Sequence, residues 1–203
     1  MEHNRFVIPS FRDNRCDTFF AAVGKALAVA TLFEASCRSL HLSVVLRDVL
    51  SQAADDGMSQ LPAILESRSA LKTYLNAQGK KLASHVSLIR QYLDSKHLEI
   101  DVLSRMTDIL DDARVARNAI AHRASLNFNE WYVDEESIDR AILFLREQVA
   151  TVVLALQLLS MMLPLLSPIP NTPPPPREEF DAMPATYQAW VFAGLARADE
   201  GAE

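Results

Sequence analysis

Residues 117–122 read RNAIAH and bring together side chains that can act on a phosphate group. The imidazole of His122 can accept and donate protons. The guanidinium of Arg117 can hold a phosphate through two parallel hydrogen bonds, and Asn118 can orient either partner. RNA is cleaved when its 2′-hydroxyl attacks the adjacent phosphate, a reaction that needs a base, an acid and charge stabilisation. Arg117, Asn118 and His122 are therefore candidate catalytic residues whose chemistry fits a reaction at phosphate such as RNA cleavage, with no cofactor and no metal ion expected.

The spacing of this pair is not specific by itself. An Arg followed by a His after four to six intervening residues arises by chance about once in a chain of this composition. Arg90 and His97 have six intervening residues, but Gln91 stands in the polar position and the spacer is polar, so we treat this pair as a decoy. Arg117 and His122 also fit a structural role, in which the His contacts the last carbonyls of a helix. Context must decide between the two interpretations.

In its context the segment resembles the signature of HEPN domains, which is Arg, a polar residue, three further residues and His. Asn118 fills the polar position, small or apolar residues fill the spacer, and the motif lies near a helix end before a long final bundle helix. The resemblance covers roughly residues 14–163. It implies a dimeric helical bundle that is a metal-independent endoribonuclease, often a toxin paired with an antitoxin or a phage-defence effector. One HEPN subgroup carries a Tyr two residues beyond the His, where the antitoxin modifies it, but Ala124 occupies that position here.

Three further charged residues have a predicted place in this site. Arg114 and Arg123 are expected to enlarge a basic, RNA-binding patch around the motif, with solvated surface charge as the alternative. Glu34 falls on the apolar face of the first helix. There it can contact Arg117, or it can simply mark the boundary of the core.

Other residues that can take part in chemistry have weaker assignments. Trp131 and Tyr132 can stack on bases, although loop aromatics more often cover the edge of a core. The two cysteines, Cys16 and Cys37, have no metal-ligand spacing and are too few for a disulfide framework, which favours a reducing, cytoplasmic location. No role is assigned to His41, His85 and His97.

The composition limits the classes of protein to which the chain can belong. Of the 203 residues, 49% are hydrophobic and 23% are charged, which excludes global disorder. Only 5 Gly residues argue against a many-turned β-sandwich or barrel. The net charge of −6 and a pI near 5.4 argue against a surface that wraps nucleic acid as a whole, but leave room for a local basic patch. The resemblance to HEPN domains implies RNA, and not DNA, as the nucleic-acid partner.

Helical periodicity runs through the whole chain, so the predicted fold class is all-α. Apolar residues recur at three- and four-residue steps, and caps and breaks separate the runs. The expected arrangement is an antiparallel bundle over residues 1–163, a Pro-rich linker over 164–177 and a tethered C-terminal helical tail over 178–203. The predicted helices run from Asp13 or Asp17 to about residue 55, from Ser59 to Gly79, from Leu82 to about His97, from about Glu99 to about His122, from Asp134 to Pro164, and from Glu178 to Arg197.

The longest apolar run, Val149–Leu166, raises the question of a membrane span. Its polar interruptions, the early stop at Pro164 and the lack of a flanking basic cluster favour a buried helix instead. Because such a surface is large for a monomer to hide, we predict a homodimer whose interface includes the helix Ile138–Leu163. The tail is expected to dock on its own bundle or on a neighbouring molecule through Phe180, Tyr187, Trp190 and Leu195.

Two functions from different classes follow from the sequence. The first is a cytoplasmic, dimeric endoribonuclease of HEPN type, with RNA as substrate and an antitoxin or regulatory protein as partner. The second is a non-catalytic HEPN-like binding or regulatory module that engages a protein partner through its dimer surface and tail. The intact Arg-Asn-x-x-x-His motif favours the enzyme, whereas the acidic balance of the chain favours the binding module.

Overall fold

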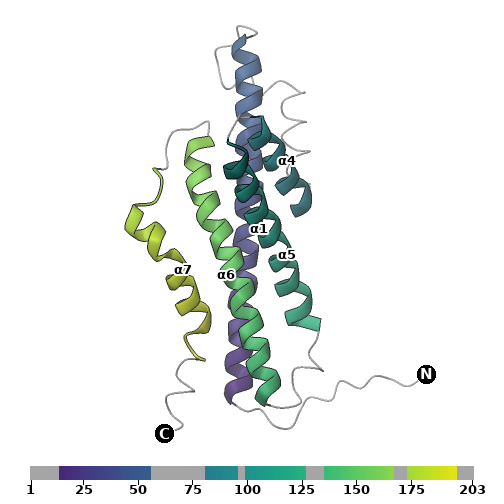
Figure 1. Ribbon diagram of the computed structural model, residues 1–203, viewed down its shortest axis with the longest axis vertical. Helices are drawn as coiled ribbons and strands as arrows, with labels where there is room; N and C mark the ends of the chain where they lie inside the picture. Colours follow the sequence, from purple (N-terminus) through teal and green to yellow (C-terminus); the bar gives the residue numbers. More distant parts are fainter. Residues whose placement is uncertain (1–13, 56–80, 96–98, 127–134, 167–172, 196–203) are drawn as a thin grey trace, which may run out of the picture.

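The computed structural model describes residues 14–55, 81–95, 99–126, 135–166 and 173–195, and every regular element in these ranges is an α-helix. The predicted all-α class is therefore confirmed. The predicted helix 59–79, the aromatic residues Trp131 and Tyr132, and His97 lie outside the described residues. The helices, drawn in Figure 1, are α1 (Asn14–Asp55), α4 (Leu82–Asp94), α5 (Ile100–Leu126), α6 (Glu135–Leu166) and α7 (Arg177–Phe192).

Helices α1, α5 and α6 form the centre of the bundle, with α5 antiparallel to α6 and α4 packed against α1 and α5 (Figure 1). On α1 the buried residues recur at three- and four-residue steps, which gives the helix one apolar stripe. Burying a large apolar side chain in this way stabilises the fold by about 1.5–3 kcal/mol. The stripe fixes α1 against α5 and so sets the position of Glu34 relative to the RNAIAH segment. Side chains with no exposed surface include Phe33 and Leu40 on α1, Leu110 and Ile120 on α5, and Leu145 on α6.

The uncharged stretch of α6 lies inside the bundle, where the helix packs against α1, α5 and α7. Val149, Val152 and Leu159 have no exposed surface. By length and composition, two helices among the described residues are apolar enough to cross a membrane, Asp17–Asp48 and Glu136–Leu166. Packing within one chain accounts for only part of the apolar surface of α6, because Leu143 (61%), Leu154 (48%) and Leu165 (72%) stay exposed. The homodimer and its predicted interface on α6 stay predictions.

Three predicted helix ends are wrong by a few residues. Helix α7, expected to run to Arg197, ends at Phe192. Helix α6 does not stop at Pro164 but continues to Leu166. A proline in the last turn removes only the hydrogen bond that its missing N–H would give to the carbonyl four residues earlier, so one half-turn can follow it. Helix α5 continues past His122 to Leu126, so the loop expected from residue 124 begins later.

The C-terminal helix α7 packs on α6 and α1 of its own chain (Figure 1). Val191, Phe192 and Leu195 are at most 4% exposed and belong to the same hydrophobic core as the bundle. The predicted docking face is partly wrong, because Trp190 is 46% exposed. Its carbonyl accepts a hydrogen bond from Lys25 Nζ at 2.9 Å and its ring lies 5.8 Å from that ammonium, which holds the indole at the boundary with water. The domain boundary after residue 163 stays a prediction.

One buried polar contact fixes α7 on α6. Pro184 has no N–H, so the carbonyl of Phe180, four residues earlier, receives no backbone hydrogen bond from it. The side-chain amide of Gln157, which is 8% exposed, donates to that carbonyl at 2.7 Å. The polar residue that interrupts the apolar run of α6 therefore satisfies an acceptor that the proline leaves open.

Candidate functional site

A cavity of about 340 Å³ opens between α1, the beginning of α4 and the middle of α5. Three of the site residues predicted from the sequence, Arg114, Arg117 and Asn118, contribute to its wall. Because these residues lie three and four positions apart on one helix, they face the same side of α5. The remaining lining residues are Glu34 from α1 and Lys81, Leu82 and Ala83 from the start of α4.

Arg117 is held in place by two neighbours. Its Nη2 atom lies 2.5 Å from Oε2 of Glu34, and its Nη1 atom donates to Oδ1 of Asn118 at 3.1 Å. The contact between Glu34 and Arg117 that the sequence allowed is therefore present. A guanidinium carries five N–H donors, so these two bonds orient the group and leave donors for a ligand. The two charged side chains keep about a quarter of their surface exposed, 27% for Arg117 and 25% for Glu34.

Further ion pairs surround this pair and make the region basic. Arg38 Nη2 lies 3.8 Å from the second oxygen of Glu34. Asp111 joins two cations, Arg114 Nε at 3.3 Å and Arg90 Nη1 at 3.5 Å. Together with Arg117 and Lys81, the network and the cavity wall hold five cationic side chains and two carboxylates, a local charge of +3 in a chain of net charge −6. A basic patch therefore exists on an acidic protein.

His122 lies beside the cavity and not in its wall. It follows Asn118 by one turn of α5, a step of about 6 Å along the helix axis, and its side chain is exposed. Asn118 in turn follows Arg114 by one turn, so the three residues form one row along α5. The side chain of Arg123, the second predicted RNA-binding residue, lies outside the described residues.

The start of α4 contributes groups that sequence reasoning missed. Lys81 precedes the helix in an extended conformation and no side chain caps the first turn. The carbonyl of Lys81 accepts hydrogen bonds from the N–H groups of Ser84 and His85, which are the first backbone bonds of the helix. The N–H groups of the two residues between, Leu82 and Ala83, precede the first hydrogen-bonded turn and so have no partner within the helix. The sequence signal was present as a Gly-Lys-Lys run directly before an amphipathic helix. Arg90, set aside as a decoy, also belongs to the network through Asp111.

A second polar cluster lies in the core two turns further along α1. Nδ1 of His41 and Nδ1 of His85 are 2.7 Å apart, and the two rings are 2% and 0% exposed. Cys37 lies one turn before His41 and has no exposed surface. Burial, with the charge of Glu34 adding to it, raises the pKa of the Cys37 thiol from 9.0 to about 12, which makes it a poor nucleophile at neutral pH. Among the described residues no group of three His, Cys, Asp or Glu side chains is arranged to hold a metal ion.

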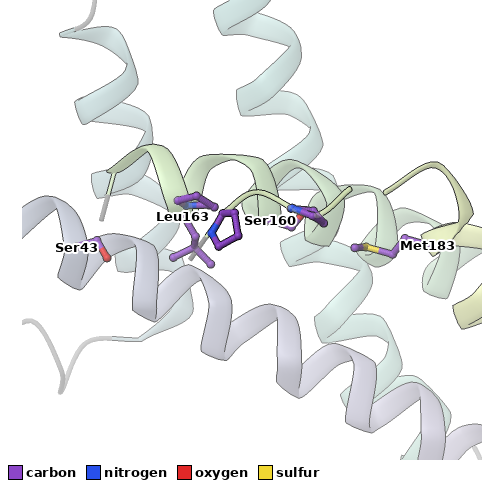
Figure 2. Close-up of a pocket in the computed structure, with 7 residues that line it drawn as sticks. Ser43, Ser160, Leu163 and Met183 are labelled. Carbon is purple, nitrogen blue, oxygen red and sulfur yellow. The ribbon is translucent and has the colours of Figure 1, made fainter. Parts of the chain in front are cut away.

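Figure 2 shows a larger and apolar cavity, of about 460 Å³, between α1, α6, α7 and the Pro-rich segment. The two hydroxyls in its wall, of Ser43 and Ser160, donate hydrogen bonds to the backbone of their own helices, at 3.0 and 2.7 Å. None of the described residues in its wall is charged. The cavity therefore offers packing surface and no reactive group. The other residues that line it are Leu163, Pro164, Pro173, Pro175 and Met183.

Comparisons of the chain with protein-family models, with curated proteins and with solved structures found no match. The resemblance to HEPN domains therefore rests on residues 117–122 and their place on a helix that precedes the long helix α6.

Proposed function

We propose that this protein is a metal-independent endoribonuclease of HEPN type that acts as a homodimer. The observation that carries the proposal is the setting of Arg117. Glu34 and Asn118 hold its guanidinium at the wall of an open cavity, and the exposed His122 lies one turn beyond Asn118. A guanidinium that is oriented in advance can stabilise charge, and an imidazole that water can reach can transfer a proton, which are two of the functions that RNA transesterification requires.

The chemistry follows from the properties of these side chains. One imidazole removes the proton of a 2′-hydroxyl, whose oxygen forms a bond to the adjacent phosphorus atom. The bond between phosphorus and the 5′-oxygen then breaks, and an imidazolium gives that oxygen a proton. Arg117 stabilises the added negative charge of the five-coordinate phosphorus through the N–H donors that Glu34 and Asn118 do not occupy. The products are a 2′,3′-cyclic phosphate and a 5′-hydroxyl.

A homodimer supports the proposal because one chain supplies only one motif histidine, whereas the reaction has two proton transfers. A two-fold axis that brings both motifs into one cleft provides the second imidazole. Val115 is 57% exposed and lies two turns before His122 on the same side of α5. We propose that a second copy packs on this exposed face of α5, which carries both Val115 and His122. The exposed apolar residues of α6 stay a second candidate for the interface.

The test is cleavage of mixed-sequence RNA by the full-length protein in the presence of EDTA. The motif supplies no cluster of carboxylate ligands, so cleavage should continue without free divalent cations. The products should end in 2′,3′-cyclic phosphate, and a substrate with a 2′-deoxy sugar at the cleaved position should resist. The His122→Ala variant, purified in parallel, measures contaminating nuclease. Undiminished cleavage by this variant would contradict the proposal.

The binding module remains the second candidate, and one observation favours it. Glu34 already neutralises Arg117, an arrangement that a purely structural ion pair would also have. In that case neither the wild-type protein nor any variant would cleave RNA. The wild-type protein would bind a partner protein, and Val115→Asp would abolish that binding.

As an enzyme, the protein would be a cytoplasmic toxin or phage-defence effector that an antitoxin or regulatory protein controls.

A further inference from the structure

Among the residues that the structure describes, the cavity wall contains one cation without an ion pair. Arg114 and Arg117 each form an ion pair, with Asp111 and Glu34. Lys81 is exposed, and no carboxylate of the described residues lies within ion-pair distance of its ammonium. Glu34 is the acidic residue among the described residues of the wall, and both its oxygens lie within ion-pair distance of a guanidinium. The cavity therefore attracts an anion despite the carboxylate in its wall.

The neutral groups around Lys81 are also donors. Leu82 and Ala83 line the cavity at the first turn of the 13-residue helix α4, where backbone N–H groups have no partner within the helix and the helix dipole is positive. Arg117 can only donate hydrogen bonds, so its contact with Oδ1 fixes the amide of Asn118. The NH₂ group of Asn118 is then left to donate to a ligand. An ammonium, backbone amides and a side-chain amide together match the oxygens of a phosphate.

We infer that this cavity is a second phosphate site for RNA, in which Lys81, the first turn of α4 and Asn118 bind the backbone phosphate next to the one that is cleaved. The inference rests on the proposed function and extends its substrate contacts from α5 to α4. At about 340 Å³ the cavity has room for a phosphate and its sugar, since a water molecule takes up about 30 Å³. Because His122 lies outside this wall, the reacting phosphate is placed at the edge of the cavity, between Arg117 and His122, and the neighbouring phosphate lies inside, where Lys81 acts in binding.

The experiment compares wild type with Lys81→Gln and with a matched control, Arg140→Gln, which also removes one exposed cation but lies on α6 and pairs with Glu136. The probe is a short RNA with a 2′-deoxy sugar at the cleaved position, so that binding is measured without cleavage. Fluorescence anisotropy should show about tenfold weaker binding for Lys81→Gln and a salt-dependence slope smaller by about one. The control should bind like wild type. On cleavable RNA, Lys81→Gln should raise KM and leave kcat unchanged, because the contact is equal in the ground and transition states.

The outcomes separate this inference from the proposed function. Binding that depends on Lys81 without any cleavage would support the phosphate site and contradict the nuclease. If Lys81→Gln cleaved RNA with the same KM as wild type, the phosphate site alone would be overturned. A wild-type protein that does not bind the RNA probe would overturn the inference as well. Inorganic phosphate and a mononucleotide are tested as competitors, and displacement of the RNA at low concentrations of either would show a site for a free phosphate compound and overturn the assignment to RNA.

Discussion

Two polar pairs join α1 to its neighbours, and they lie two turns apart on the same side of the helix. Glu34 pairs with Arg117 of α5 in the wall of a cavity, and about a quarter of each side chain is exposed. His41 pairs with His85 of α4 in the core, where the rings are 2% and 0% exposed. A partly exposed ion pair contributes little to stability, because salt screens the attraction and water solvates the separated charges almost as well as the pair stabilises them. A buried donor or acceptor that loses its partner costs about 1–3 kcal/mol.

Along α1, the partly exposed pair of Glu34 and Arg117 is therefore assigned to function and the buried pair of His41 and His85 to folding. Between two Nδ1 atoms 2.7 Å apart only one proton fits, so one ring donates and the other accepts. That geometry selects one packing of α4 on α1. The guanidinium of Arg117 keeps donors that the fold does not use, so the pair with Glu34 can be rearranged by a ligand at small energetic cost. We expect substitutions at the cavity to change activity and substitutions at the buried pair to change stability.

The largest effect that this comparison predicts is on RNA cleavage. His122→Ala should lower the rate about 10²–10⁴-fold, because one acid–base side chain typically contributes that much. Arg117→Ala should be comparably damaging through lost charge stabilisation. Both variants should keep the wild-type urea midpoint and helical circular dichroism. The control is Arg140→Ala, an exposed cation on α6 that should retain full activity. If Arg117→Ala lost activity together with much of its stability, Arg117 would serve folding, as the buried histidine pair does.

The next largest effect is on stability, at the buried pair. His85→Ala leaves the ring of His41 without this hydrogen bond and creates a cavity, so it should lower the free energy of unfolding by about 2–4 kcal/mol. Urea unfolding followed by circular dichroism measures the change. His122→Ala is the matched control, since it removes the same side chain from an exposed position and should change stability by less than about 0.5 kcal/mol. Equal midpoints for the two variants would mean that the buried pair does not select the packing of α4.

Sequence reasoning reached the parts of the site that are local in the chain. Arg114, Arg117 and Asn118 share a cavity because they share one face of one helix, and helical spacing can be read without a structure. Lys81 and Arg90 join them only because α4 folds against α5. Lys81 lies 33 positions before Arg114, and Arg90 lies 21 positions before its partner Asp111. The buried pair also joins residues 44 positions apart, so neither histidine had a recognisable partner. Trp190 was expected on the docking face of the tail because it is apolar, but it is 46% exposed and contacts Lys25 at the surface.

Cys37 lies between the two pairs on α1. The pKa of its thiol therefore shows whether its surroundings resemble the buried core or the partly exposed cavity. Its pKa is raised to about 12 by burial first and by the charge of Glu34 second. Above pH 9 the unfolded chain loses the thiol proton while the folded chain keeps it, so stability should fall as pH rises. The expected slope is about 1.4 kcal/mol per pH unit between pH 9 and 12, and below pH 9 the contribution is fully present. Urea unfolding at pH 8 and pH 10.5, in reductant, should show a steeper fall for wild type than for Cys37→Ala. Parallel pH profiles would place the thiol in contact with water.

The smallest effect expected is the coupling between Glu34 and Arg117 in the folded protein. Since both side chains keep about a quarter of their surface exposed, a double-mutant cycle of Glu34→Gln and Arg117→Gln should give about 0.2–1 kcal/mol of coupling in stability. The same cycle in activity should differ, because Glu34→Gln leaves the guanidinium present but less well oriented. That variant should lose part of kcat and hold its KM, and Glu34→Asp, which keeps the charge on a shorter side chain, should lose less. A stability coupling of about 3 kcal/mol or more is the size seen for buried ion pairs. It would show that Arg117 is committed to the fold and not available to a phosphate.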